Sequence, residues 1–221
     1  MNKLLTTIFA VAVSCVTVSS LAQEIKGDAK AGETKNAMCI GCHGIKGYQA
    51  SFPEIYKVPM ISGQGDKYIV AALNAYKKGE RKHPTMRSIA ESLTDQDIAD
   101  LAAYYSAHGA AAGAELPAKP AKEPSADVQA LLNKANCASC HGANFSKPID
   151  PAYPKIAGQH SDYLFVALKA YKTDNNPKVG RGNAIMAGMA KQYTNAELKL
   201  LANYLASVDG ELKVIPQSKF R

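Results

Sequence analysis

Two copies of the pentapeptide Cys-x-x-Cys-His, at residues 39–43 and 137–141, carry the most specific chemistry in this chain. Two thiols at this spacing add across the vinyl groups of haem as thioethers, and the adjacent histidine reaches the iron as an axial ligand. The sequence therefore predicts two covalently bound haems c. The residues concerned are Cys39, Cys42 and His43 in the first copy and Cys137, Cys140 and His141 in the second.

Paired cysteines also occur in zinc sites and in redox dithiols, and the context of these two pairs disfavours both. A zinc ribbon usually separates its cysteine pairs by about 15–20 residues, whereas Cys42 and Cys137 lie much further apart in the sequence. Neither pair stands in the βαβ pattern of a thioredoxin-like protein. The fifth cysteine, Cys15, precedes both copies, so no disulfide is expected.

Methionine sulfur is predicted to occupy the other axial position of each iron. Met86 and Met186 stand at equivalent places in two matching stretches, whereas Met60 aligns with a lysine and Met189 with an isoleucine. Two core methionines that fill gaps are the alternative, and Met189 remains a competitor for the second haem. Because a methionine ligand raises the reduction potential of haem iron, this pairing is typical of an electron carrier with no open coordination site.

Histidine is the other candidate for the sixth ligand. Three histidines stand outside the haem motifs, and each aligns with a different residue type in the other copy, so none is duplicated. We interpret them as surface or loop residues, although one of them lies three residues before Met86. They are His83, His108 and His160.

The elements that must position these ligands form a duplicated helical domain. Residues 58–64 match residues 153–159, and the agreement continues beyond them, which is the signature of an internal repeat. Apolar residues recur at helical spacing over residues 66–78, and residues 28–38 are expected to form a short helix that ends at the first motif. Thr94 is a predicted N-cap with an acidic residue three positions on, as in a capping box. The expected fold class is all-α, with two tandem haem domains.

Four segments follow from this organisation. Residues 1–22 have the positive residue, apolar run and small-residue cleavage site of an export signal. Residues 23–108 and 127–221 are the predicted haem domains, and the connector at residues 109–126 contains three prolines that favour an extended strap over a helix. A weak lipoprotein processing site at Cys15 is the alternative fate of the signal.

The chain carries a formal net charge of +7. The four propionates of two haems would offset much of this charge, so the basic balance predicts no nucleic-acid binding. It is compatible with docking on an acidic partner surface, where charge mainly raises the encounter rate.

On these motifs, the mature chain resembles the class I cytochromes c, and two such domains with a Pro-containing connector resemble the cytochrome c4 family of periplasmic dihaem carriers. Residues 59–63 and 154–158 match the Pro-x-Leu-x-Gly segment of that class. The resemblance implies that the carbonyls of Pro59 and Pro154 accept a hydrogen bond from the proximal histidine ring, which fixes its tautomer and strengthens its donation to iron. The residues expected to pack on the haems in place of leucine are Ile61 and Ile156.

The same class packs its first and last helices closely, with a small residue facing an aromatic one. Gly32 and Tyr104 fit those roles in the first copy, and Ala130 and Tyr204 fit them in the second. An arginine five residues before each methionine is a candidate to pair with haem propionates through bidentate hydrogen bonds, a solvated loop residue being the alternative. These arginines are Arg81 and Arg181.

The resemblance also implies a function in electron transfer. A carrier of this kind takes electrons from a quinol-oxidising cytochrome bc complex and passes them to a haem-copper terminal oxidase or to a reductase. A dihaem subunit of a larger dehydrogenase, such as a flavocytochrome, is the main alternative, and a dihaem peroxidase is a weaker one because both methionine positions are filled. The expected partners are redox proteins, and the protein is expected to be a monomer. Peripheral association with a membrane is compatible with these two expectations. The two haems are expected to face one another across the domain interface with coupled potentials.

Overall fold

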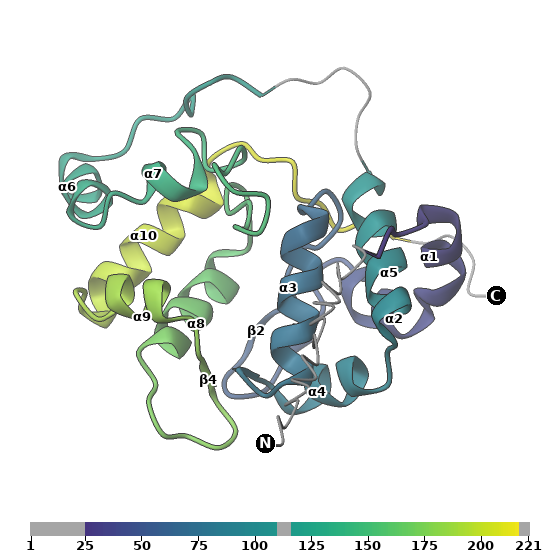
Figure 1. Ribbon diagram of the computed structural model, residues 1–221. Coiled ribbons are helices and arrows are strands. Elements are labelled where there is room, and N and C mark those ends of the chain that lie inside the picture. The colour runs from purple at the N-terminus through teal and green to yellow at the C-terminus, as the bar shows by residue number, and fades with distance from the viewer. Residues whose placement is uncertain (1–24, 110–115, 217–221) are drawn as a thin grey trace, which may run out of the picture.

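The computed structural model describes residues 25–109 and 116–216, so the predicted export signal and Cys15 lie outside the described residues. Two helical lobes lie side by side, and the described part of the connector runs over the outside of the second lobe (Figure 1). The first lobe contains α1 (Ala29–Lys35), α2 (Ala37–His43), α3 (Asp66–Lys77), α4 (Pro84–Glu91) and α5 (Asp95–Ala107). The second contains α6 (Ala126–Lys134), α7 (Ala138–His141), α8 (Ser161–Tyr171), α9 (Ala184–Ala190) and α10 (Asn195–Ser207).

The strands of the described chain have two residues each and leave the predicted all-α class intact. In the first lobe, β1 (Gln49–Ala50) pairs antiparallel with β2 (Tyr56–Lys57). The second pair joins the two lobes, because β3 (Arg81–Lys82) comes from the first and β4 (Gly180–Arg181) from the second. This pairing places Arg81 directly opposite Arg181.

Local capping explains where the helices begin. Thr94 accepts a hydrogen bond from the backbone N–H of Asp97, whose side chain accepts from the backbone of Thr94, so the predicted capping box is present at α5. The equivalent box at Thr194 starts α10. The helix expected over residues 28–38 is divided, because α1 ends at Lys35 and α2 begins after Asn36, so the first haem motif occupies a helix of its own.

Helices α1 and α5 cross at Gly32. A Cβ atom placed there would lie 2.1 Å from the backbone oxygen of Asp100 and 2.7 Å from the Cβ atom of Tyr104, so no residue larger than glycine fits this approach. Asp100 stabilises the same crossing of α1 and α5. Its side chain accepts a hydrogen bond from the backbone N–H of Asp28 at 2.8 Å and forms an ion pair with Lys35 at 2.6 Å. The predicted contact between Gly32 and Tyr104 is therefore present.

The corresponding crossing in the second lobe is built differently. The expectation that Ala130 faces Tyr204 is wrong, because Ala130 is exposed. The buried residues of α6 are Val128 and Leu132, which join the same core cluster as Tyr204. Large apolar side chains at these two positions orient α6 and turn the alanine towards solvent.

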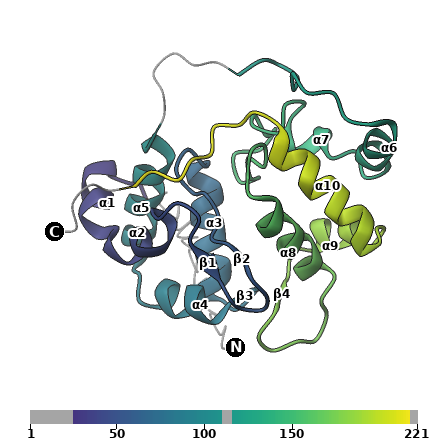
Figure 2. The same ribbon diagram turned by 180° about the vertical axis from the view of Figure 1, so that it is seen from behind.

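The segment that follows α10 returns to the first lobe. After α10, the C-terminal segment crosses towards α5 and α1 (Figure 2). There the backbone N–H of Lys213 donates to the carbonyl of Ser62 at 3.1 Å, and the side chain of Lys213 donates to the carbonyl of Gly109. The two lobes are thus joined by the pairing of β3 with β4 and by the segment that follows α10.

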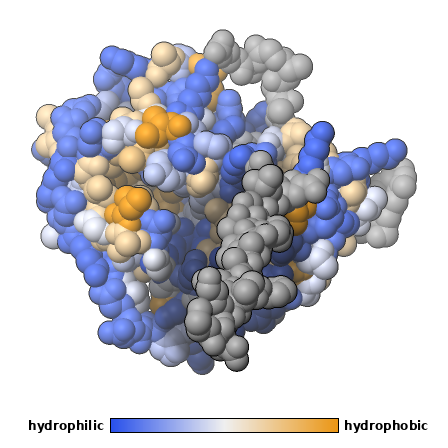
Figure 3. Space-filling model, viewed as in Figure 1, coloured by the Kyte–Doolittle hydropathy of each residue, from blue (hydrophilic) through white to orange (hydrophobic). Residues whose placement is uncertain are grey.

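Exposed apolar side chains are dispersed over the surface. The face in Figure 3 carries small hydrophobic patches separated by hydrophilic residues. Ile55 and Ile149 are the most exposed of the large apolar residues described, at 70% and 71%. Among the described helices, none combines the length and the apolar character that a membrane span requires.

Candidate haem sites and the junction between the domains

The first haem motif lies on a short helix, and the second begins at the residue before one. Cys39 and Cys42 belong to α2, and residues three apart on a helix face the same side. In the second copy Cys137 immediately precedes α7, which contains Cys140. All four thiols are partly buried and form no disulfide in the described chain, as covalent attachment of a cofactor requires.

Both hydrogen bonds expected of the proximal histidines are present. The Nδ1 atom of His43 lies 2.8 Å from the carbonyl oxygen of Pro59, and that of His141 lies 2.9 Å from the carbonyl oxygen of Pro154. Since a carbonyl can only accept, Nδ1 carries the proton and Nε2 keeps the lone pair that an iron ion needs. Burial lowers the pKa of both histidines, which favours the neutral ring that binds a metal.

The two candidate methionine ligands occupy the same place in their helices. Met86 lies in the first turn of α4, where its backbone N–H donates to the side chain of His83. Met186 lies in the first turn of α9 and donates in the same way to Asn183 at 2.9 Å. His83 is therefore the cap of α4, a role that the sequence did not predict, and asparagine has the same role at α9.

The remaining histidines and methionines show no such equivalence. The ring of His108 contacts the hydroxyl of Ser62 at 2.9 Å, and His160 directly precedes α8 without a side-chain cap. The Met189 sulfur lies 3.8 Å from the side-chain amide of Gln192.

The two arginines meet at the junction between the lobes. Arg81 donates to the hydroxyls of Tyr163 at 2.7 Å and Tyr68 at 3.2 Å, and Arg181 donates to Tyr163 at 3.1 Å. Burial alone would raise the pKa of Tyr163, but the two guanidinium groups lower it to about 8. The two cations thus share a phenol across the junction.

This arrangement fits an anionic cofactor. In the described part of the chain neither guanidinium is hydrogen-bonded to a carboxylate, and the Nε atom of Arg81 is buried without a partner. Two neighbouring cations in a partly buried place are unfavourable unless an anion joins them. Haem propionates are anions of the required kind, and Arg81 and Arg181 would hold them.

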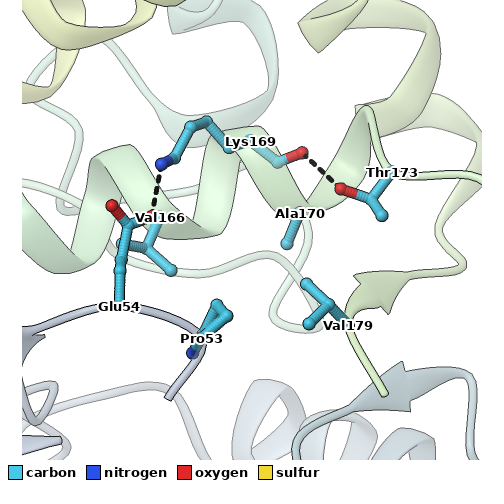
Figure 4. Close-up of a pocket in the computed structure, with 7 residues that line it drawn as sticks. All are labelled: Pro53, Glu54, Val166, Lys169, Ala170, Thr173 and Val179. Carbon is cyan, nitrogen blue, oxygen red and sulfur yellow. Dashed lines mark hydrogen bonds and ion pairs between the residues drawn. The ribbon is translucent and has the colours of Figure 1, made fainter. Parts of the chain in front are cut away.

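A pocket at the junction lies apart from the predicted haem contacts. It lies between Pro53 and Glu54 of the first lobe and Val166 and Lys169 of α8, and an ion pair joins Lys169 to Glu54 (Figure 4). None of the residues that line this pocket is a predicted haem contact.

Comparison with known proteins agrees with this geometry. The family model "Cytochrome c" matches the chain twice, over residues 29–107 and 125–209. Cytochrome c4 of Thiocapsa roseopersicina is 32% identical over 192 residues, which cover 81% of this chain and 92% of that protein. The chain belongs to the cytochrome c4 family. The crystal structure of reduced recombinant cytochrome c4 from Pseudomonas stutzeri is similar with a TM-score of 0.58 at 26% identity, over 83% of this chain and 100% of that one.

As a member of this family, the chain is a dihaem electron-transfer protein with two tandem cytochrome c domains and two covalently bound haems c. Another similar protein is the thiosulfate dehydrogenase electron acceptor of Stutzerimonas stutzeri (strain A1501). It is 28% identical over 208 residues, which cover 89% of this chain and 92% of that protein. The residue-by-residue assignment of the haem contacts stays a prediction.

Two kinds of residue at the junction were not predicted from the sequence. Tyr68 and Tyr163, which bind the arginines, and Gln64 and Gln159, which cross between the lobes, were all visible as matched positions of the repeat. These polar residues recur at equivalent positions in both copies although none is a predicted iron ligand. This recurrence is the signal that could have identified them.

Proposed function

We propose that the protein is a periplasmic electron carrier between a quinol-oxidising cytochrome bc complex and a terminal haem-copper oxidase or reductase. The observation that carries this proposal is the duplicated contact of His43 with Pro59 and of His141 with Pro154. Each bound haem c supplies a centre that accepts and releases one electron. The protein sets the potential of that centre and the fit to its partners.

The side chains have separable roles in this proposal. Cys39, Cys42, Cys137 and Cys140 attach the cofactors permanently, so no exchange competes with electron transfer. His43 and Met86 would fill both faces of one iron, and His141 and Met186 would fill both faces of the other. Protein ligands on both faces of each iron would leave substrate no place to coordinate, which favours a carrier over a peroxidase.

A second function is favoured by one comparison. Similarity to a thiosulfate dehydrogenase electron acceptor supports a carrier that is reduced by a dehydrogenase instead of by a bc complex. Both functions use the same two haem sites and differ only in the donor.

Reduction kinetics test these two functions directly. The purified dihaem protein is mixed either with membranes that contain a bc complex and quinol, or with a soluble dehydrogenase and its substrate, and haem absorbance is followed. Fast reduction by one donor and re-oxidation by oxidase-containing membranes are expected. A five-coordinate high-spin ferric spectrum, or turnover of peroxide, would overturn the carrier proposal.

A further inference from the structure

A reciprocal pair of glutamines joins the two domains. The side chain of Gln159 accepts from the backbone N–H of Met60 at 3.0 Å and donates to the carbonyl of Met60 at 2.9 Å. In the same way, Gln64 accepts from the N–H of Lys155 at 2.9 Å and donates to its carbonyl at 3.0 Å. Met60 and Lys155 are equivalent positions of the repeat, so the contact has approximate two-fold symmetry.

Each glutamine reaches the peptide group that holds the opposite domain's proximal histidine. The carbonyl of Pro59, which accepts from His43, and the N–H of Met60, which donates to Gln159, belong to one peptide group. A continuous chain of hydrogen bonds therefore runs from the first domain's histidine to a side chain of the second domain. An equivalent series of hydrogen bonds runs from His141 of the second domain through the peptide group of Pro154 to Gln64 of the first domain.

The glutamines are held firmly enough to transmit an effect. Both are 4% exposed. Their side-chain oxygens also accept from a backbone N–H of their own domain, that of Gly65 for Gln64 and that of His160 for Gln159, each at 3.0 Å. Because a backbone N–H can only donate, the amide oxygen must face it, and the orientation of each side chain is fixed.

We propose that Gln159 tunes the reduction potential of the first haem, and Gln64 that of the second, by strengthening the hydrogen bond between the proximal histidine and its proline carbonyl. Both are positioning residues that act through a peptide group of the other domain. The inference rests on the proposed assignment of His43 and His141 as iron ligands.

The sign of the effect follows from hydrogen-bond polarisation. When the N–H of a peptide donates, its carbonyl becomes more negative and a better acceptor, which strengthens the next hydrogen bond by roughly 10–30%. A stronger bond at Nδ1 makes the histidine a more basic iron ligand. Greater basicity stabilises ferric iron, so each glutamine lowers the potential of the haem in the opposite domain.

The test uses single substitutions in the full dihaem protein. In Gln159→Leu the ring N–H signal of His43 in nitrogen-15 NMR should shift and the first haem's potential should rise, while the signal of His141 moves much less. Gln64→Leu should give the mirror image. Haem methyl signals followed during a redox titration assign each potential to its domain.

Two further variants separate tuning from loss of the interface. Lys57→Ala removes the side-chain contact with Asp162, which also joins the domains, but leaves both glutamines in place, so it should leave both ring signals near their original positions. Gln159→Glu retains an oxygen acceptor for the N–H of Met60 and should return the first haem's potential towards, or below, its original value.

The outcomes distinguish the relay from the ligand assignment beneath it. Equal shifts at both histidines in each leucine variant, shifts in the same domain as the substitution, or an equal response to Lys57→Ala would overturn the relay. If the ring signals of His43 and His141 lack the large displacement that a bound haem produces, the ligand assignment itself is wrong.

Discussion

Replacement of Gly32 by alanine should selectively destabilise the first domain. The added Cβ would lie 2.1 Å from the backbone oxygen of Asp100, whereas a close carbon–oxygen contact needs about 3.3 Å, so α1 and α5 must separate by about 1.2 Å. This movement would stretch the 2.8 Å hydrogen bond from Asp28 to Asp100 beyond bonding distance. Overpacking costs roughly 1–3 kcal/mol, and a buried group left without its partner costs a similar amount.

Together these effects should lower the free energy of unfolding by about 3 kcal/mol, and the melting temperature of a domain this size by roughly 12–24 °C. Circular dichroism during heating of the dihaem protein measures the first transition. Thr34→Ala changes an exposed residue of the same helix and serves as the control. If Gly32→Ala melts within a few degrees of Thr34→Ala, the close crossing does not constrain α1, and the reasoning fails.

Three other predictions concern the cofactors and the charge on Asp100. A pyridine haemochrome assay should find two haems c per chain, and the double substitution Cys39→Ala, Cys42→Ala should leave one; extractable haem in the original protein would contradict covalent attachment. Met86→His should lower one of the two midpoint potentials in a redox titration and leave the other, and an unchanged pair would exclude Met86 as a ligand. Lys35 beside Asp100 lowers the pKa of that carboxyl, so its charge stabilises the fold above the unfolded pKa of about 4, and this stability is lost as the pH falls through the folded pKa. Urea midpoints measured from neutral to acid pH should therefore fall less steeply for Asp100→Asn than for the original protein.

Local signals in the sequence predicted much of the fold. The cap at Thr94 and the apolar spacing of α3 act within a few residues, so they could be identified from the sequence without knowledge of the contacts between elements. The internal repeat allowed further predictions, because a weak indication at one position is strengthened when the equivalent position of the other copy carries the same residue type. It paired Met86 with Met186, and the structure places both in the first turn of equivalent helices.

Features that depend on packing between distant elements were predicted only where the family resemblance implied them, as for the contact between Gly32 and Tyr104. The exposure of Ala130 follows from which face of α6 fits the core, and Val128 and Leu132 decide this in three dimensions. The contacts of Gln64 and Gln159 depend on how the two domains dock. The periodicity of a sequence carries no information about docking between domains. Duplication makes symmetric docking possible, but the sequence does not state its geometry.

The return of the C-terminal segment to Ser62 has a consequence for the order in which the protein can be completed. Ribosomes make the first domain first, yet its edge at Ser62 pairs with Lys213, which is synthesised only after α10 of the second domain. The first domain must therefore wait until the helices of the second domain have been made before its own structure is finished. A premature stop codon shortly after α10 would damage this domain, although every residue of it has been translated.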